Sequence, residues 1–250
     1  MSVLYSPRGV SALHRLAACP AILAFDLDGT LAPLVDDPDD AMVPPATAKR
    51  MQDLSRSWPV AVITGREVSD AQSRLGFKPH YLFGNHGAER RGASRCPALS
   101  GLLDTCRAHL GDTAAELRAQ RIEFEDKGLS LALHYRDAID PDRARLWLDR
   151  LIATLGANLR ASHGRGVVNI TPAAAPAKGD ALLEIMRDCR VTHTMVIGDG
   201  VNDEDAFAKA PAGSVSVRVG PSEEPTLADF HLPAQWQVDG VLSLLLWLRR

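Results

Sequence analysis

One stretch near the start of the chain constrains the fold more than any other: an apolar run that ends in two aspartates and a glycine. Residues 22–25 are Ile-Leu-Ala-Phe, and Asp26-Leu27-Asp28-Gly29-Thr30-Leu31 follows them. Because side chains two positions apart on a strand point to the same side, Asp26 and Asp28 are expected to face one way. Acids at the carboxyl end of a strand lie where open α/β sheets bind ligands. The alternative is a strand that simply ends in a charged turn, and the order of the other segments argues against it.

The first and last thirds of the chain alternate between apolar runs and helical patterns. The expected helices cover residues 45–57, 67–75, 178–189, 203–209 and 238–250, and the expected strands cover 21–25, 59–63, 81–83, 194–197 and 215–219. Such alternation is typical of an α/β fold with a parallel sheet. We therefore expect a core domain made of residues 1–90 and 173–250, in which 1–20 form a lead-in with a helical turn around 11–18.

The middle of the chain has a different pattern. The expected order is a helix over 97–120, strands over 121–125 and 129–136, a helix over 140–155, and strands over 158–162 and 167–171. Asp126-Lys127-Gly128 suits a hairpin turn, and Asp140-Pro141 supplies an N-cap and a first-turn proline. Helices between hairpins indicate an α+β arrangement, so we predict that residues 91–172 are an inserted domain.

Composition narrows the classes of partner. The chain has 250 residues and a formal net charge of −3 without a basic tract, so a nucleic-acid partner is not expected. The apolar segment at 242–248 is far too short to cross a bilayer, and the first twenty residues lack the continuous apolar segment of a secretory signal. We therefore expect no membrane partner and a cytoplasmic location. The oligomeric state stays open, with a monomer favoured.

Polar residues that suit phosphoryl transfer follow several of the expected strands. They are Asp26 and Asp28, Thr64, Lys178, and Asp199 with Asp203. A carboxylate can attack phosphorus, and a second acid can move the proton of the leaving alcohol. Further carboxylates can hold a hard divalent cation, while an ammonium and a hydroxyl hold the phosphoryl oxygens. Taken singly, Thr64 and Lys178 read as a capping residue and a solvated lysine; taken together in this order, the residues indicate one site.

These motifs resemble the four conserved motifs of the haloacid dehalogenase superfamily. The resemblance implies a Rossmann-like parallel-sheet core with an inserted α+β cap, Mg²⁺ as cofactor and an aspartyl-phosphate intermediate. It also implies a role for each matching position. By this resemblance, Asp26 is the nucleophile and a metal ligand, and Asp28 is the general acid and base and offers its backbone carbonyl to the metal. Thr64 and Lys178 hold the phosphoryl group. Asp199 and Asp203 belong to the metal site.

A narrower resemblance is to the trehalose-6-phosphate phosphatase family. Thr64-Gly65-Arg66, the loop Gly84-Asn85-His86-Gly87-Ala88-Glu89 and the hairpin that carries Lys127, Ser130 and His134-Tyr135-Arg136 are similar to that family's motifs. The resemblance implies a sugar phosphate as the partner of the site. The residues that we expect to contact it are Gly65, Arg66, Asn85, His86, Glu125, Lys127, Ser130, His134, Arg136 and Asn169.

Two departures from the family pattern bear on specificity. Val168-Asn169-Ile170 stands where the family usually has Val-Glu-Ile, so Asn169 replaces an expected sugar ligand. Gly200 and Asn202 differ from the family's usual last motif, whereas Asp199 and Asp203 are kept. These differences affect the predicted identity of the sugar more than the predicted chemistry.

The sequence thus predicts a Mg²⁺-dependent phosphatase that hydrolyses trehalose 6-phosphate to trehalose and phosphate. A phosphatase for another glycosyl or sugar phosphate is the first alternative, because of Asn169. A phosphomutase using the same intermediate and a catalytically silent sugar-phosphate sensor are less favoured. A sensor has no need for Asp28.

Overall fold

The computed structural model describes residues 2–94, 96–221 and 225–249 of the chain. The chain divides into two compact units: Met1–Gly92 with Pro176–Arg250, and Ala93–Ala175. We call the first the core unit and the second the inserted unit. Each is described by itself below.

Short strands and helices make up both units. The strands are β1 (Ser2–Val3), β2 (Ala21–Phe25), β3 (Val60–Ile63), β4 (Tyr81–Gly84), β5 (Glu89–Arg90), β6 (Glu123–Asp126), β7 (Leu131–His134), β8 (Leu159–Gly164), β9 (Val167–Pro172), β10 (His193–Gly198), β11 (Val215–Val219) and β12 (Phe230–Leu232). The α-helices are α1 (Pro7–Ala17), α2 (Pro45–Leu54), α3 (Val68–Arg74), α4 (Pro97–Gly101), α5 (Asp104–Asp112), α6 (Ala114–Ala119), α7 (Pro141–Ala153), α8 (Lys178–Cys189), α9 (Glu204–Lys209) and α10 (Val238–Leu248). Short 3₁₀ turns lie at η1 (Pro38–Asp40), η2 (Asn85–Gly87), η3 (Val201–Asp203) and η4 (Gln235–Gln237).

The core unit is built on one sheet with the strand order β1-β12-β11-β10-β2-β3-β4-β5. All neighbouring strands are parallel except β4 and β5, which are antiparallel. β2 lies between β10 and β3, at the point where the strand order reverses. Ligands bind beyond the carboxyl ends of the strands at such a point. The expected α/β core with a parallel sheet is therefore confirmed.

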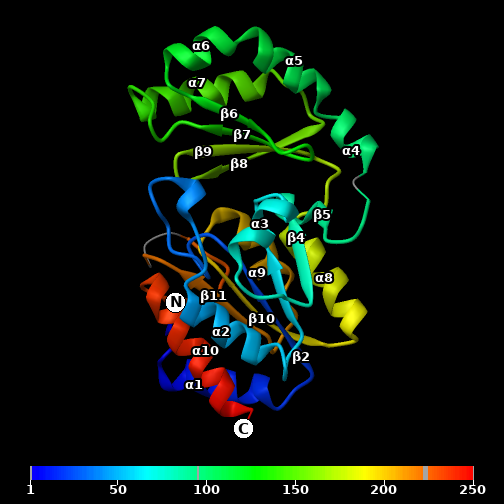
Figure 1. Cartoon of the computed structure of the whole chain (residues 1–250), viewed down its shortest axis with the longest axis vertical. Helices are drawn as coiled ribbons and strands as arrows, with labels where there is room; N and C mark the ends of the chain where they lie inside the picture. Colours follow the sequence, from blue (N-terminus) through cyan, green and yellow to red (C-terminus); the bar gives the residue numbers. More distant parts are fainter. Residues whose placement is uncertain (1, 95, 222–224, 250) are drawn as a thin grey trace. The chain divides into compact units, whose positions relative to one another are not determined.

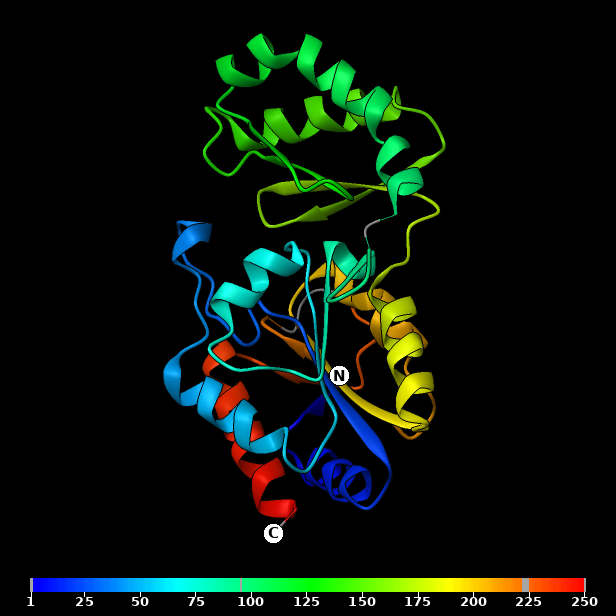
Figure 2. The same ribbon diagram turned by 45° about the vertical axis from the view of Figure 1, so that its right-hand side comes forward.

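Helices cover both faces of this sheet, as Figures 1 and 2 show. Side chains along β2 point alternately to the two faces of the sheet, and every residue of β2 is buried, so a helical layer packs on each face. Leu23 and Phe25 pack with α1, α2 and α10, whereas Ile22 and Ala24 pack with α8 and α9. A strand that is buried on both faces reads as a continuous apolar run, which is why residues 21–25 could be recognised in the sequence.

The inserted unit contains an antiparallel sheet with the order β6-β7-β9-β8. Leu131, Leu133, Val168 and Ile170 point from this sheet into a core shared with α5, α6 and α7. In the alternate row of the register, Glu125 lies opposite Ala132, which lies opposite Asn169, which lies opposite Ser162. Because side chains alternate between faces, this polar row lies on the face away from that core.

Three local expectations were wrong. The helix expected over 97–120 is divided into α4, α5 and α6, and the Thr113 hydroxyl at the second break bonds to the backbone carbonyl of His109 at 3.1 Å. Such a bond competes with continued helix formation. The turn expected at 11–18 is the longer helix α1, which starts at Pro7 behind the capping Ser6. The short strands β1, β5 and β12 were missed, because runs of two or three residues give no readable period.

Among the described residues, no helix is both long enough and apolar enough to span a membrane.

Candidate functional site

The residues expected to do chemistry in the core unit follow neighbouring strands. Asp26 comes directly after β2, Thr64 directly after β3 and Asp199 directly after β10. Lys178 is the first residue of α8, which packs against the same sheet. Parallel strands end at one edge, so this topology brings together side chains that lie up to about 170 positions apart in the sequence.

A buried ammonium joins two of the carboxylates. The side chains of Lys178 and Asp203 are 4% and 3% exposed, and that of Asp26 is 10% exposed. The Nζ of Lys178 lies 2.9 Å from Oδ1 of Asp26 and 2.8 Å from Oδ1 of Asp203. Burial by itself would lower the pKa of Lys178, but Asp203 and Asp26 outweigh it and raise the pKa, so the ammonium is charged.

Three carboxylates form a group that could hold a metal ion. Asp26, Asp199 and Asp203 each offer an oxygen, and these oxygens lie within 4.8 Å of one another. Burial, followed by the charge of Asp203, raises the pKa of Asp199 to about 7. Burial also raises the pKa of Asp26 well above its usual value, against the opposing effect of Lys178. Without a cation, ionised carboxylates are therefore disfavoured in this buried place, and oxygen ligands of this kind suit a hard divalent cation.

Two glycines let the backbone approach these carboxylates. A Cβ at Gly198 would lie 2.1 Å from Cγ of Asp203, and a Cβ at Gly29 would lie 2.1 Å from Oδ2 of Asp199. Gly29 also has φ +75°, which other residues rarely adopt. The backbone N–H of Gly200 donates to Oδ2 of Asp203 at 2.8 Å. The backbone thus sets the positions of Asp199 and Asp203, and Lys178 also holds Asp203.

The start of α8 is anchored to α9. Oδ2 of Asp205 accepts a hydrogen bond from the backbone N–H of Gly179 at 2.9 Å. The ammonium of Lys209 lies 2.7 Å from Oδ1 of Asp180 and 3.0 Å from Oδ1 of Asp205. A carboxylate at a helix amino end satisfies backbone donors that have no partner within the helix. These contacts hold the first turn, and with it Lys178, in place.

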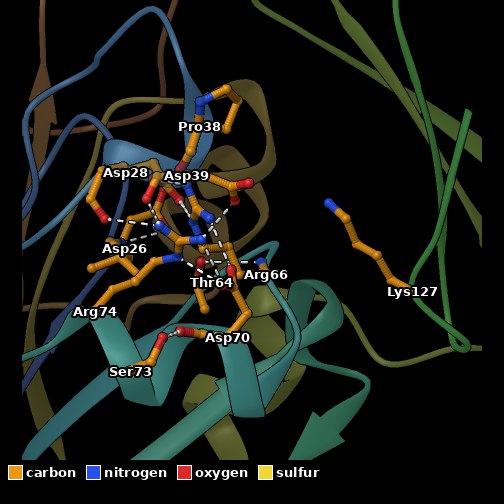
Figure 3. A network of polar contacts seen from close by, with 12 residues as sticks. Asp26, Asp28, Pro38, Asp39, Thr64, Arg66, Asp70, Ser73, Arg74 and Lys127 are labelled. Atoms are coloured by element: carbon orange, nitrogen blue, oxygen red, sulfur yellow. Dashed lines mark hydrogen bonds and ion pairs between the residues drawn. The ribbon is translucent and has the colours of Figure 1, made fainter. Parts of the chain in front are cut away.

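Asp28 is turned toward Arg66, as Figure 3 shows. Its two carboxylate oxygens accept from Nε and Nη2 of Arg66 at 2.8 and 2.9 Å. This is a bidentate pair, the geometry that a guanidinium and a carboxylate favour. Asp28 does not belong to the close carboxylate group found among the described residues. Its expected metal contact is through the backbone carbonyl, and that stays a prediction.

Thr64 is fully buried and its hydroxyl oxygen accepts from the backbone N–H of Arg66 at 3.2 Å. Its backbone carbonyl accepts from the N–H of His86 at 2.9 Å. The loop that supplies this bond is tightly wound, since Asn85, His86 and Gly87 have φ of 48°, 59° and 109° in succession. A Cβ at Gly87 would lie 2.5 Å from the carbonyl oxygen of Ala177. The loop therefore supports Thr64 on one side and the start of α8 on the other.

Two of the expected sugar contacts, Asn85 and His86, are buried in this loop, at 0% and 9% exposure. Nδ2 of Asn85 donates to Oε2 of Glu89 at 2.8 Å, and the same oxygen accepts from the backbone N–H of Val68 at 3.0 Å. Gly65 lies against the ring of His86, because a Cβ there would come within 2.4 Å of Cε1. These residues have clear structural roles, and their contact with a sugar stays a prediction.

The remaining expected sugar contacts lie in the inserted unit. Oε2 of Glu125 is 2.9 Å from Nε2 of His134 and 3.3 Å from Nζ of Lys127. Partial burial acts to raise the pKa of Glu125, but the hydrogen bond with His134 and the charge of Lys127 outweigh it and lower the pKa. Ser130 is buried, and its backbone carbonyl accepts from the N–H of Lys127 at 2.9 Å within the hairpin turn.

The other two predicted residues of the inserted unit are Arg136 and Asn169. Nη2 of Arg136 donates to the carbonyl of Arg165 at 3.4 Å, and Asn169 is 6% exposed. Asn169 lies in the same polar row as Glu125. Of the residues predicted in this unit, Glu125, His134 and Asn169 lie on the adjoining strands β6, β7 and β9. Lys127 and Ser130 lie in the turn between β6 and β7, and Arg136 follows β7.

Sequence reasoning missed Arg218. It is 6% exposed on β11, its Nη1 donates to the carbonyl of Gly200 at 2.9 Å, and the same atom lies 3.4 Å from Oε1 of Glu204. Glu204 in turn accepts from the backbone N–H of Leu227 at 2.7 Å. Arg218 therefore supports the loop that carries Asp199. An arginine inside the valine-rich run 215–219 was the available signal.

The chain is similar to proteins of one known family over most of its length. Residues 24–235 match the family model described as trehalose-phosphatase. A probable trehalose-phosphate phosphatase of Sinorhizobium fredii is 32% identical over 235 residues, which cover 89% of this chain and 86% of that protein. An uncharacterized glycosyl hydrolase of Mycobacterium tuberculosis is 32% identical over 251 residues, which cover 90% of this chain and 18% of that protein.

This chain matches only part of the length of several of its relatives. It spans about half, 51%, of a trehalose-phosphate phosphatase of Mycobacterium tuberculosis to which it is 31% identical over 204 residues, 77% of this chain. Among solved structures, the C-terminal domain of the trehalose-6-phosphate phosphatase of C. albicans superposes with a TM-score of 0.84 at 21% identity, and 98% of each chain is covered. That likeness concerns the fold, and it agrees with an α/β core unit that carries an inserted unit.

Proposed function

The chain belongs to the trehalose-phosphatase family, and on that premise we propose that it hydrolyses trehalose 6-phosphate to trehalose and phosphate with Mg²⁺ as cofactor. The observation that carries the proposal is the arrangement around Lys178, whose ammonium bonds to Asp26 and Asp203 at the ends of the central strands. A cation held beside a carboxylate nucleophile lets a negatively charged phosphoryl group approach it.

Asp26, Asp199 and Asp203 would hold the Mg²⁺ ion, together with the backbone carbonyl of Asp28. Three carboxylates within 4.8 Å of one another and the raised pKa of Asp199 support this assignment. When bound, the ion neutralises charge on the phosphoryl oxygens and on the carboxylates.

The reaction proceeds in two displacements. An oxygen of Asp26 attacks phosphorus and the bond from phosphorus to the sugar oxygen breaks, while Asp28 gives a proton to the leaving alcohol. Asp28 then accepts a proton from water, whose oxygen attacks the aspartyl phosphate and releases inorganic phosphate and Asp26. Thr64 and Lys178 hold the phosphoryl oxygens in both steps. Thr64 is fixed for this task by its bonds to the backbone on either side.

We assign substrate specificity to an inserted cap over 91–172 and the chemistry to a core over 1–90 and 173–250. The polar row of the inserted sheet, with Glu125 and Asn169, offers the donors and acceptors that a polyhydroxy sugar needs. Gly65, Asn85, His86, Lys127, Ser130, His134 and Arg136 complete the residues proposed for substrate. A cytoplasmic location and a monomeric state are part of the same proposal and rest on the sequence alone.

The test is phosphate release from trehalose 6-phosphate, glucose 6-phosphate, sucrose 6-phosphate and p-nitrophenyl phosphate. Each is assayed with Mg²⁺, with EDTA and with the Asp26→Asn variant. We expect preference for trehalose 6-phosphate, loss of turnover in EDTA, and no turnover in Asp26→Asn, since an amide is a far weaker nucleophile than a carboxylate. Full activity of Asp26→Asn would refute the assigned nucleophile. Binding without release of phosphate from any substrate would instead support a sensor.

A second candidate is a phosphatase for another glycosyl phosphate. Asn169 favours it, because a neutral amide stands where the family usually has a carboxylate, in a buried position of the polar row. A carboxylate and an amide present different hydrogen-bonding groups to a hydroxyl. The same panel separates the two candidates, since a different preferred sugar phosphate would favour the second.

A further inference from the structure

The guanidinium of Arg66 has an unusually complete set of protein partners. Nε and Nη2 donate to the two oxygens of Asp28, Nη1 donates to Asp70 at 2.8 Å, and Nη2 also donates to the carbonyl of Pro38 at 2.8 Å (Figure 3). The side chain of Arg66 is 13% exposed and that of Asp28 is 32% exposed. A guanidinium has five N–H donors, so these four bonds leave one.

This count argues against Arg66 as a ligand of the phosphoryl group. An arginine that binds phosphate does so best with two parallel N–H donors. Arg66 cannot present two such donors without giving up a bond to Asp28, to Asp70 or to Pro38. The edge of the guanidinium that suits an oxyanion is already used by the Asp28 carboxylate.

Arg66 is itself held in place by a chain of charges along α3. Asp70 accepts from Arg66 through one oxygen and from Nε of Arg74 at 2.8 Å through the other. The guanidinium of Arg74, 8% exposed, also contacts Asp39 at 3.0 Å. Asp70 and Arg74 lie four residues apart on α3, the spacing that aligns side chains on one face of a helix, and Arg66 precedes the N-cap of that helix. The acidic segment around Asp39 is thereby tied to Asp28 through two arginines.

We propose that Arg66 is a positioning residue for Asp28: it fixes the plane of the carboxylate that moves the proton, and it does not bind the phosphoryl group. The inference rests on the proposed function, because it takes Asp28 as the general acid and base. Four bonds from Arg66, two of them to Asp28, hold that carboxylate in one orientation.

The proposal makes the effect of Arg66 depend on the leaving group. A sugar alcohol leaves only when it is protonated, whereas p-nitrophenolate leaves without a proton. Loss of Arg66 therefore slows the first step on a sugar phosphate but spares it on p-nitrophenyl phosphate. The second step needs Asp28 as a base with either substrate, so the aspartyl phosphate accumulates when p-nitrophenyl phosphate is used.

The experiment compares Arg66→Lys and Arg66→Met with the unaltered chain on trehalose 6-phosphate and p-nitrophenyl phosphate. The lysine keeps the charge and loses the bidentate geometry. Arg56→Lys serves as the control, since Arg56 is 72% exposed and pairs with Asp53 three residues away. Stopped-flow release of p-nitrophenol reports the first step, steady-state release of phosphate reports the whole cycle, and thermal unfolding checks that each variant is folded.

For both Arg66 variants we expect kcat on the sugar phosphate to fall about 100-fold, a typical contribution of general acid–base catalysis, with little change in KM. On p-nitrophenyl phosphate we expect a rapid burst of p-nitrophenol at the unaltered rate, followed by a slow steady state. Asp70→Asn, which removes the charge that holds Nη1, should show the same pattern more weakly.

An equal loss on both substrates with a raised KM and no burst would overturn the proposal, because that pattern indicates a phosphate ligand. Turnover of p-nitrophenyl phosphate but of no sugar phosphate would overturn the proposed substrate alone, and the burst would still test Arg66. Absence of turnover on every phosphate ester by the unaltered chain would overturn both proposals, since Asp28 would then have no proton to move.

Discussion

Each unit contains a cluster in which one central side chain contacts two others, and the two clusters differ in how far they are exposed to solvent. In the core unit the ammonium of Lys178 is shared by Asp26 and Asp203, and these side chains are between 3% and 10% exposed. In the inserted unit Glu125 is shared by Lys127 and His134, and the carboxylate is 47% exposed. Removing one member of a buried pair leaves an uncompensated charge, which is costly, whereas an exposed pair contributes little.

The two clusters also differ in how closely the backbone approaches their carboxylates. Gly29 and Gly198 bring the main chain against Asp199 and Asp203 so closely that no side chain fits between them. Glu125 and His134 lie on the paired strands β6 and β7, and their partly exposed side chains contact each other. Close backbone contacts therefore fix Asp199 and Asp203 in the core unit, whereas the partly exposed group around Glu125 can change with little effect on the fold.

The largest effect that follows from this contrast is expected for Gly198→Ala. Its Cβ would lie 2.1 Å from Cγ of Asp203, so either the backbone or the carboxylate must move. We expect the free energy of unfolding to fall by about 1–3 kcal/mol, as for other overpacked sites, and phosphatase activity to be lost. Urea unfolding and phosphate release measure the two effects.

Gly111→Ala is the matched control for this substitution. Gly111 lies in α5 of the inserted unit, and nothing lies within 4 Å of the position of its Cβ. Alanine favours a helix over glycine, so a gain of about 0.5–1 kcal/mol is expected there. A Gly198→Ala variant as stable and as active as the unaltered chain would show that the carboxylate is not held by the backbone.

The second prediction is that the two units respond to pH in opposite directions when the protein is free of metal. Burial raises the pKa of Asp199 from 3.8 to about 7, so between these values the folded state binds more protons than the unfolded state. The stability of the core unit should therefore fall as pH rises from about 4 to 7, by at most a few kcal/mol. In the inserted unit the pKa of Glu125 lies below 4.5, so stability should fall as pH drops through that value.

Hydrogen exchange in EDTA, corrected for intrinsic rates and resolved by mass spectrometry, measures each unit separately. Protection in β2 and β10 should decrease between pH 5 and 7.5 and recover when Mg²⁺ is added, because a ligand that binds the folded state stabilises it. Protection in β6 and β7 should decrease only toward acid pH. Parallel pH responses of the two units would contradict the contrast between the clusters.

A smaller effect is expected for Glu125→Gln. The pair contacts are partly exposed, so stability should change by less than about 1 kcal/mol. If Glu125 binds the sugar, KM for trehalose 6-phosphate should rise roughly 10-fold, as for the loss of one charged hydrogen bond, while p-nitrophenyl phosphate is unaffected. Glu116→Gln, on the exposed side of α6, is the control. An unchanged KM would remove Glu125 from the proposed substrate contacts.

The smallest overall effect is expected for Asn169→Glu, which restores the residue that the family pattern usually has. We expect the ratio of kcat/KM between trehalose 6-phosphate and sucrose 6-phosphate to shift by about 10-fold, a change of about 1.4 kcal/mol, with no change on p-nitrophenyl phosphate. Asn169→Gln controls for side-chain length. An unchanged ratio in both variants would show that this position does not read the sugar.

The sequence predicted the elements with strong local signals. The bounds of α8 and β11 agree with the expected 178–189 and 215–219, because a helix pattern beginning after a proline-rich segment and a short β-branched run each have clear ends. The helix over 97–120 was wrong because Thr113 ends α5 through its own hydroxyl bond, a local competition that periodicity does not report.

The site could be predicted in part. The strand-end residues were found because their order along the chain and the parallel topology place them at one edge of the sheet. The pairing of Arg66 with Asp28 could not be found, since it joins residues 38 positions apart through side-chain geometry. The support that Arg218 gives to Gly200 depends likewise on the twist and register of β11, which sequence spacing does not specify.

The cluster around Lys178 also has a simple charge count. Asp26, Asp199 and Asp203 in ionised form contribute three negative charges and Lys178 contributes one positive charge, which leaves a net charge of −2. One divalent cation brings the total to zero, and a phosphate ester dianion returns it to −2. The net charge of the cluster therefore changes with what is bound, and on the proposed function we expect the ester to bind more tightly once the cation is in place. On the proposed function, we expect free phosphate, an anion like the ester, to compete for the place beside Lys178, which would be measured as product inhibition.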